Sequence, residues 1–260
     1  MSLYEYLICE IEQSVATVFI NRPPLNPLNS QVFLELTTMF VELEQKEEVK
    51  AIVLTGSGDK AFVAGADIHQ MLSLDGVGML EMSAVSRAAY SQVEKSSKPV
   101  IAAINGLALG GGLELILACD LRIASSKAKF AFPEVGLGII PGGGGTQRLQ
   151  RIVGQGTAKE LLYFGDMFDA KKAEQIQLIN KVVEPYEVLK EAQKWAGKLA
   201  QKPAVAMRML KTAVNSGADV DLEAGLTIEG MCFQTAFATE DRKEGMTAFV
   251  EKRKPIYMGK

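Results

Sequence analysis

A glutamate, Glu114, lies two residues after a run of three glycines, Gly110–Gly112. An apolar run that ends at Ile104 and the turn pair Asn105-Gly106 precede the glycines, and a helical pattern over 113–118 follows them. Without Cβ atoms, this backbone allows close approach of a ligand, and the first N–H groups of a helix have no partner within it. A developing oxyanion suits such donors. The apolar surroundings of Glu114 predict partial burial and a raised pKa, which favours acid or base chemistry. The alternative is a tight turn with a favourable charge at a helix N-terminus.

A second glycine-rich loop extends from Gly136 to Gly145, and a helix is expected to start at Thr146. The loop exposes many backbone N–H groups directly before that helix, which predicts a second site for an anion. Its apolar residues favour a functional loop over the alternative, a flexible surface loop.

The histidine content excludes several chemistries, because His69 is the only histidine. It lies away from any plausible nucleophile, so Ser-His-Asp and Cys-His mechanisms are not expected, and metal sites built from His pairs are impossible. The glycines near Lys60 and Lys159 lack the spacing of a nucleotide-binding loop. Carboxylates and backbone amides therefore remain as the reactive groups.

The composition describes a soluble globular chain of 260 residues with 48% hydrophobic residues and a net charge of −3. Because acidic and basic residues are interspersed, neither nucleic acid nor a membrane surface is expected as a partner. No targeting segment is apparent at the N-terminus, and no apolar run approaches the roughly 18 residues that a membrane span needs. Three separated cysteines in apolar contexts, Cys9, Cys119 and Cys232, favour buried thiols in the cytoplasm over disulfides or a metal site.

Strand and helix patterns alternate along the first two thirds of the chain. Two apolar runs before Ile20 predict a hairpin, and an amphipathic helix is expected from Ser30, its N-cap, to Gln45. Further strands are predicted over 51–55, 99–104, 121–124, 129–132 and 179–183, and a helix over 79–94. This order is typical of an α/β fold.

Beyond Gly154 the patterns are mostly helical, over 188–199, 204–215, 222–237 and 242–251. Apolar residues such as Leu226, Met231 and Phe233 exceed what one thin helical layer would cover, which predicts subunit contacts. Ordinary core packing is the alternative.

Several motifs occur in a fixed order along the chain. They are Ala64-Gly65-Ala66-Asp67, Ile104-Asn105-Gly106, Gly110-Gly111-Gly112-Leu113-Glu114, Pro133-Glu134-Val135-Gly136-Leu137, the segment from Pro141 to Leu149, and the segments 238–245 and 249–253. Together they resemble the enoyl-CoA hydratase (crotonase) family over nearly the whole chain. The resemblance implies an α/β fold, a crotonase-like spiral of ββα units. It also implies a core over 1–195 that carries the acyl-CoA site and a C-terminal helical oligomerisation region over 196–260.

The same resemblance assigns roles to residues of this sequence. The backbone N–H groups of Ala66 and Gly111 would form the oxyanion hole for a thioester carbonyl. Glu114 would be the base that activates water, and Glu134, 20 residues further on, the acid that protonates C2. Coupled carboxylates can share these roles. The Gly142 N–H would orient the water.

Contacts to the CoA part of the substrate are implied for Leu25, Ala64, Asp67 and Ile68 within one chain. Phe249 and Lys252 would reach the CoA of a neighbouring subunit in a trimer or dimer of trimers. His69 stands where relatives often carry lysine, and Pro27 replaces the usual alanine. Gly143 also replaces a common alanine, from which we expect only a looser loop.

The implied activity is reversible hydration of trans-2-enoyl-CoA to 3-hydroxyacyl-CoA, in fatty-acid or butanoate metabolism. No metal and no separate cofactor are expected, because coenzyme A is part of the substrate. An isomerase or another enolate enzyme of this fold is one alternative, although isomerases of the family commonly keep only one of the two glutamates. A non-catalytic scaffold that binds CoA or RNA is the other, and the near-balanced charge does not favour RNA.

Overall fold

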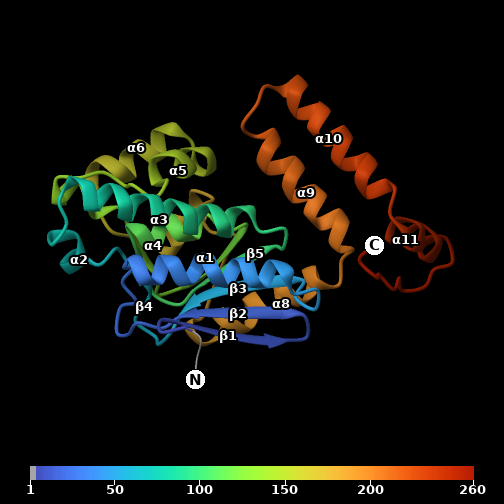
Figure 1. The fold of residues 1–260 in the computed structure, drawn as a ribbon, viewed down its shortest axis with the longest axis horizontal. Helices are drawn as coiled ribbons and strands as arrows, with labels where there is room; N and C mark the ends of the chain where they lie inside the picture. Colours follow the sequence, from blue (N-terminus) through green and yellow to red (C-terminus); the bar gives the residue numbers. More distant parts are fainter. Residues whose placement is uncertain (1–3) are drawn as a thin grey trace.

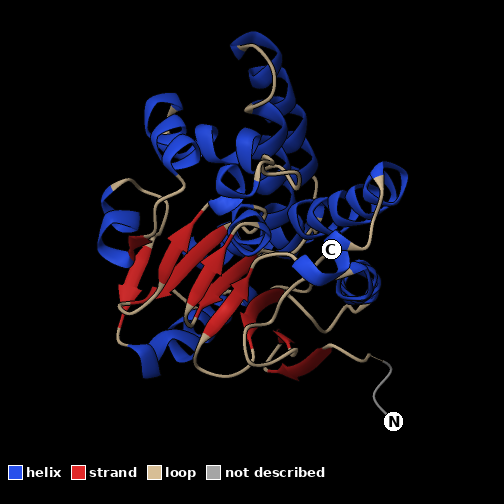
Figure 2. Cartoon of the chain, turned by 90° about the vertical axis from the view of Figure 1, so that its left-hand side faces the viewer, coloured by secondary structure: helices blue, strands red, loops and turns tan. Residues whose placement is uncertain are grey.

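Six strands form the larger of two sheets in the computed structural model, which describes residues 4–260. In spatial order they are β1 (Leu7–Glu12), β2 (Val15–Ile20), β3 (Ala51–Gly56), β5 (Val100–Ile104), β7 (Leu121–Ser125) and β10 (Lys181–Val183). β1 and β2 form the predicted antiparallel hairpin, and all other neighbours in this sheet are parallel. Figure 2 shows the strands as a twisted array with helices on both sides.

The smaller sheet contains β4 (Ala61–Ala64), β6 (Leu107–Leu109), β8 (Lys129–Ala131) and β9 (Phe168–Asp169). Each of β3, β5 and β7 is followed along the chain by a strand of this second sheet and then by helical structure. The chain therefore repeats a ββα unit whose two strands belong to different sheets. This arrangement confirms the expected α/β spiral.

Helices surround the sheets (Figure 1). They are α1 (Ser30–Gln45), α2 (Ile68–Leu72), α3 (Gly76–Lys95), α4 (Gly111–Leu117), α5 (Gly145–Val153), α6 (Gln155–Phe164), α7 (Ala170–Gln175), α8 (Val188–Ala200), α9 (Ala204–Gly217), α10 (Leu222–Phe237) and α11 (Glu240–Val250), with 3₁₀ helices η1 (Pro133–Leu137) and η2 (Pro185–Glu187).

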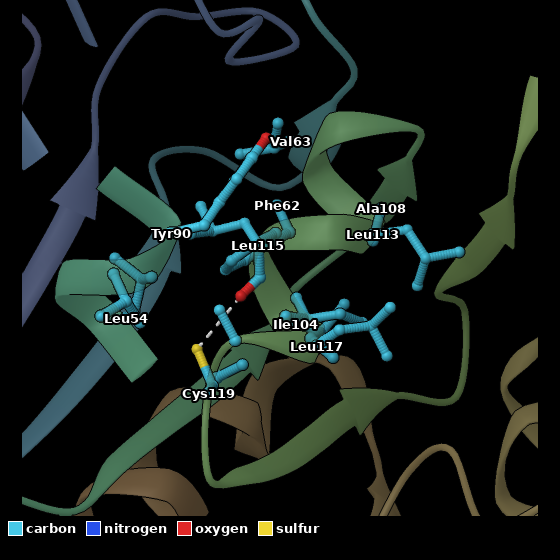
Figure 3. Close-up of a cluster of buried hydrophobic side chains, with 14 of the residues drawn as sticks. Leu54, Phe62, Val63, Tyr90, Ile104, Ala108, Leu113, Leu115, Leu117 and Cys119 are labelled. Carbon is cyan, nitrogen blue, oxygen red and sulfur yellow. Dashed lines mark hydrogen bonds between the residues drawn. The ribbon is translucent and has the colours of Figure 1, made fainter. Parts of the chain in front are cut away.

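The central strands β3 and β5 of the larger sheet are buried on both faces, and their side chains alternate between those faces. Ile52 and Leu54 of β3 point into the main core, whereas Val53 packs in a second cluster with Ala192 and Ala196 of α8. Figure 3 shows part of the main core around α4, including Leu113 and Leu115. This packing holds the first turn of α4 between the two sheets.

Some local predictions were wrong. The N-cap of α1 is Asn29, whose Oδ1 accepts the Val32 N–H at 2.9 Å, and Ser30 is the first helical residue. The sequence patterns also missed β6, η1, α6 and α7, because short elements depend on pairing and packing more than on their own periodicity.

The helices after α8 stand away from the sheets (Figure 1). α9 and α10 pack against each other, and Cys232 is the only buried residue of α10. Leu226, Met231 and Phe233 are exposed, so the apolar surface predicted on this helix is not covered by the core of the same chain. The predicted boundary at 195 falls inside α8, whose buried residues face the larger sheet.

All three cysteines are free. Among residues 4–260, none of the helices combines the length and apolar character that crossing a membrane requires. The expectation about the first residues of the chain falls partly on residues 1–3, which lie outside the described part.

Candidate active site

The turn between β6 and α4 brings the two glutamates together. Gly110 has a φ of 47°, a left-handed conformation that favours glycine, and its N–H donates to the carbonyl oxygen of Ala131 at 2.9 Å. A Cβ at Gly110 would lie 2.7 Å from Oε1 of Glu134. The close approach of Glu134 to the turn before Glu114 therefore requires a residue without a side chain at this position.

Glu114 is 4% exposed and is held by the second glycine-rich loop. Its Oε1 accepts the N–H groups of Gly143 and Gly145, each at 2.8 Å. Burial raises the pKa of Glu114, and the two N–H donors oppose that rise because they favour the charged carboxylate. The predicted burial and direction of the pKa shift are confirmed.

Glu134 lies in η1 and has a different environment. Its Oε2 is buried and has no hydrogen-bond partner within residues 4–260. Burial, and secondarily the charge of Glu114, raises the pKa of Glu134 from 4.5 to about 7. The pair therefore combines a carboxylate stabilised by N–H donors with a carboxyl group that retains its proton to higher pH.

Two free backbone amides lie near this pair. In the bridge between Leu28 and Ala66, the N–H of Leu28 donates to Gly65 and the N–H of Asp67 donates to Leu28. The Ala66 N–H between these two bonds points away from Leu28. Gly111 is the first residue of α4, so its N–H has no partner within the helix. A Cβ at Gly111 would lie 3.7 Å from the Ala66 nitrogen. Within residues 4–260 neither N–H donates a hydrogen bond, so both can serve one carbonyl oxygen.

The loops beside Ala66 carry four further predicted contact residues. The Ala64 N–H donates to the carbonyl oxygen of Leu25 at 2.9 Å, and the side chains of Leu25 and Ile68 are exposed. The carboxylate of Asp67 caps α2 and forms an ion pair with Arg22 at 2.6 Å, which lowers its pKa. Asp67 thus shapes this loop whether or not it also contacts a ligand.

Within residues 4–260, three other predicted residues make no hydrogen bond or ion pair with the two carboxylates. Gly142 is exposed, and the loop N–H groups that reach Glu114 are those of Gly143 and Gly145. Phe249 belongs to α11 and Lys252 follows it, on the side of the molecule opposite α2 (Figure 1). A single chain does not bring these last two residues to its own Glu114.

The expectation that Gly143 only loosens its loop is wrong. A Cβ at this position would overlap the ring of Tyr90 and lie 2.6 Å from Oε2 of Glu114. Tyr90 is 1% exposed, and its hydroxyl donates to the carbonyl oxygen of Gly111 at 3.0 Å. Gly143 is therefore required by the packing around Glu114.

The sequence did not identify Gly143 and Gly145 as hydrogen-bond donors to Glu114. It also did not identify Tyr90 and Arg148 as residues that contact the site. Two glycines spaced by one residue before a helix were the available signal for the donors. Nothing in the local sequence of Tyr90 or Arg148 marks their contacts with Gly111 and Glu94, because these partners lie far along the chain. Within the described residues, no group of three or more His, Cys, Asp or Glu side chains could hold a metal ion.

Comparison with known proteins identifies the family of this chain. Residues 10–260 match the family model described as enoyl-CoA hydratase/isomerase. A crotonyl-CoA hydratase of Syntrophomonas wolfei is 48% identical over 258 residues, covering 99% of both chains. A short-chain-enoyl-CoA hydratase of Clostridium acetobutylicum is 47% identical over 249 residues, covering 95% of both.

Solved structures show the same fold. An enoyl-CoA hydratase subunit of Geobacillus kaustophilus has a TM-score of 0.94 and 43% identity, covering 100% of both chains. An enoyl-CoA hydratase of Bacillus anthracis has a TM-score of 0.96 and 38% identity, covering 98% of this chain and 100% of the other. The spiral of ββα units and its paired carboxylates thus define a crotonase-fold protein. The chain belongs to the enoyl-CoA hydratase/isomerase family.

Proposed function

We propose that this chain is an enoyl-CoA hydratase, which adds water reversibly across the 2,3 double bond of a trans-2-enoyl-CoA thioester. The observation that carries the proposal is the contrast between its two glutamates. Two N–H groups donate to Glu114, whereas Glu134 has an unpaired buried oxygen and a pKa of about 7. Hydration needs an ionised group that deprotonates the water attacking C3 and a protonated group that delivers a proton to C2.

The N–H groups of Ala66 and Gly111 form the oxyanion hole in this mechanism. They donate to the thioester oxygen, which gains negative charge as water adds to C3 and an enolate forms. Loss of one such donor typically costs about 10²- to 10³-fold in rate, or roughly 3 kcal/mol. Free, preoriented amides stabilise this charge without reorganisation during the reaction.

The two carboxyl groups move the protons. Glu114, as the carboxylate, removes a proton from water while the water oxygen forms a bond to C3. Glu134, as the acid, delivers its proton to C2 as the enolate collapses. Proton exchange with solvent then restores both groups, so the net change is addition of H and OH. Gly142 lies on the exposed side of the loop, where its N–H can orient the water.

Leu25, Ala64, Asp67 and Ile68 hold the CoA part of the substrate in our proposal. Phe249 and Lys252 do so from a neighbouring subunit, because they lie away from Glu114 in their own chain (Figure 1). We propose a trimer or dimer of trimers that assembles through residues 196–260, and a catalytic core over 1–195. The exposed apolar residues of α10 support this assembly.

Substrates with short acyl chains are proposed because two relatives at 47–48% identity are named for crotonyl-CoA and short-chain enoyl-CoA. The reaction would then belong to fatty-acid or butanoate metabolism, and it requires no cofactor besides the CoA of the substrate. The three free thiols support a cytoplasmic location. A rate series from C4 to C16 enoyl-CoA tests the chain-length preference.

The activity is tested by loss of the absorbance of the conjugated enoyl thioester, matched by formation of 3-hydroxyacyl-CoA. Glu114→Gln and Glu134→Gln should each reduce kcat by at least about 10²-fold, the lower part of the range for general acid–base catalysis. Wild-type rates in both variants would refute the two-carboxylate mechanism. Conversion of a 3-enoyl-CoA without incorporation of water would indicate an isomerase, and acyl-CoA binding without turnover would indicate a scaffold.

A further inference from the structure

Arg148 of α5 joins the loop that holds Glu114 to α3. Its Nε and Nη2 donate to the two carboxylate oxygens of Glu94 at 2.8 and 2.7 Å, a bidentate pair. Its Nη1 donates to the carbonyl oxygen of Gly143 at 2.9 Å. The Arg148 side chain is 19% exposed and that of Glu94 36%, so this pair is partly shielded from solvent.

The carbonyl oxygen that accepts the hydrogen bond from Arg148 belongs to the peptide between Gly143 and Gly144. That peptide lies between the two N–H groups, of Gly143 and Gly145, that bind Glu114. Gly144 has a φ of 112°, so its backbone has conformational freedom that other residues lack. A hydrogen bond from a fixed guanidinium removes that freedom and keeps both flanking donors in place.

Glu94 lies one helical turn after Tyr90 on α3, so the same helix fixes the backbone of both residues. Tyr90 donates its hydroxyl to the carbonyl of Gly111, the residue whose N–H faces the proposed thioester oxygen. One helix therefore supports both the oxyanion turn, through Tyr90, and the Glu114 loop, through Glu94 and Arg148.

We propose that Arg148 is a positioning residue for Glu114, anchored by Glu94. This inference rests on the proposed function of Glu114 as the base. Arg148 touches neither the substrate nor the reacting atoms. It fixes the peptide between the two N–H donors, and its positive charge favours the ionised form of Glu114.

The charged and titratable groups around Glu114 come from three elements. Arg148 of α5 lowers the pKa of Glu114, and the charge of Glu114 raises the pKa of Glu134 of η1 and that of Tyr90 of α3. Glu94 pairs with Arg148 and raises the pKa of that residue. Removal of Arg148 thus takes away one of the groups that oppose the effect of burial, and the pKa of Glu114 rises further.

The experiment compares wild type with Arg148→Met, Arg148→Lys and Glu94→Gln, using crotonyl-CoA between pH 5 and 9. Arg148→Met should lower kcat by about 10- to 100-fold, the effect of a small misplacement, with little change in KM. The acidic limb of its kcat profile should shift to higher pH, because hydration needs ionised Glu114. Arg148→Lys should restore the position of that limb, since it keeps the charge, but only part of kcat. Glu94→Gln should lower kcat with a smaller shift.

Arg151→Met is the matched control. Arg151 lies on the same helix and pairs with Asp219 at 3.3 Å in an exposed ion pair. Its removal should leave kcat and the pH profile unchanged. Wild-type kcat and pH profile in Arg148→Met, even with a lower Tm, would overturn the proposal. If Arg148→Met does not fold, unchanged kinetics in both Arg148→Lys and Glu94→Gln would overturn it.

A second measurement separates this inference from the proposed function. Titration of ¹³C-labelled glutamate carboxyl groups, with Glu114→Gln used to assign the resonance, reports the pKa of Glu114 without turnover. If wild type does not hydrate crotonyl-CoA, the proposed function fails, yet a higher Glu114 pKa in Arg148→Met supports the positioning role. If wild type is active and neither pKa nor kcat responds to Arg148→Met, the positioning role alone fails.

Discussion

The hydroxyl of Tyr90 donates a hydrogen bond of 3.0 Å to the carbonyl oxygen of Gly111. This contact joins α3 to Gly111, the first residue of α4. The N–H groups of Gly111 and Ala66 are the two free amides near the glutamates. The ring of the same tyrosine occupies the space where a Cβ at Gly143 would lie. One buried side chain therefore determines the spacing between the glycine turn at the start of α4 and the loop that binds Glu114.

Tyr90→Phe should reduce both stability and activity. The buried carbonyl of Gly111 loses a neutral donor, which costs about 1 kcal/mol of the free energy of unfolding. If the same amount is lost from the transition state, kcat falls roughly 5-fold. Urea unfolding and steady-state kinetics check this, with Tyr186→Phe as the control because Tyr186 is 83% exposed. Equal effects of the two substitutions would contradict the role of the hydroxyl.

Gly143→Ala should impair the site through the clash of its Cβ with Tyr90 and Oε2 of Glu114. Overpacking typically costs 1–3 kcal/mol, so we expect a fall in stability of about that size and a loss of kcat. Gly156→Ala is the matched control, since a Cβ there meets nothing within 4 Å. In a background with Tyr90→Leu the alanine should cost less, because the ring is absent. Strictly additive effects of Gly143→Ala and Tyr90→Leu would exclude the proposed clash.

Hydration should decline as pH rises through about 7. In the proposed mechanism Glu134 is the acid, and its pKa of about 7 means that the required proton is lost above this pH. The kcat/KM profile of wild type tests this prediction. A basic limb that persists unchanged in the residual activity of Glu134→Gln would assign the limb to another group.

Glu134 should also make stability depend on pH. Its pKa is raised from 4.5 in the unfolded chain to about 7 in the folded chain, so the folded state binds more protons between these values. Wild type should therefore lose stability relative to Glu134→Gln as pH rises from about 4.5 to 7, and the difference should level off above 7. Denaturant unfolding across this range measures it. The exposed Glu47→Gln should not reproduce the slope.

Phe233→Glu should reduce the size of the assembly. Phe233 of α10 is 65% exposed in the single chain, and its ring lies 5.6 Å from that of Phe237. A charge buried at a subunit contact lacks a partner and is strongly unfavourable. Sedimentation velocity should show smaller species, and KM should rise because Phe249 and Lys252 would no longer reach a neighbour. Val41→Glu, an equivalent change at an exposed position of α1, is the control. An unchanged sedimentation coefficient would exclude this face of α10 from the interface.

Local sequence was sufficient for the elements with strong periodicity. β3 and β5 are continuous apolar runs buried on both faces, and the apolar residues of α1 recur at helical spacing, so each pattern had one interpretation. β6 has only three residues, and it exists because β4 and β8 pair with it. Its strand character is a property of the sheet and is absent from its own pattern.

The site shows the same division. The glycine turn, the free N–H of Gly111 and the burial of Glu114 follow from residues next to one another in the chain. The role of Gly142 in orienting the water stays a prediction, and the sequence did not show that the N–H groups of Gly143 and Gly145 bind Glu114. Successive loop amides point in different directions, and only the folded path of the loop determines which of them reach the carboxylate.

The sequence by itself determined the longer strands and helices, the glycine turn that exposes an amide and the presence of two glutamates, because these depend on short-range patterns of residue type. Tertiary structure decided which residues hold those two glutamates and their loops in place. Glu94 and Arg148, and likewise Tyr90 and Gly143, are more than fifty residues apart in the chain. Their contacts exist because α3 and α5 pack around the same core, and packing over such separations is not encoded in any local pattern.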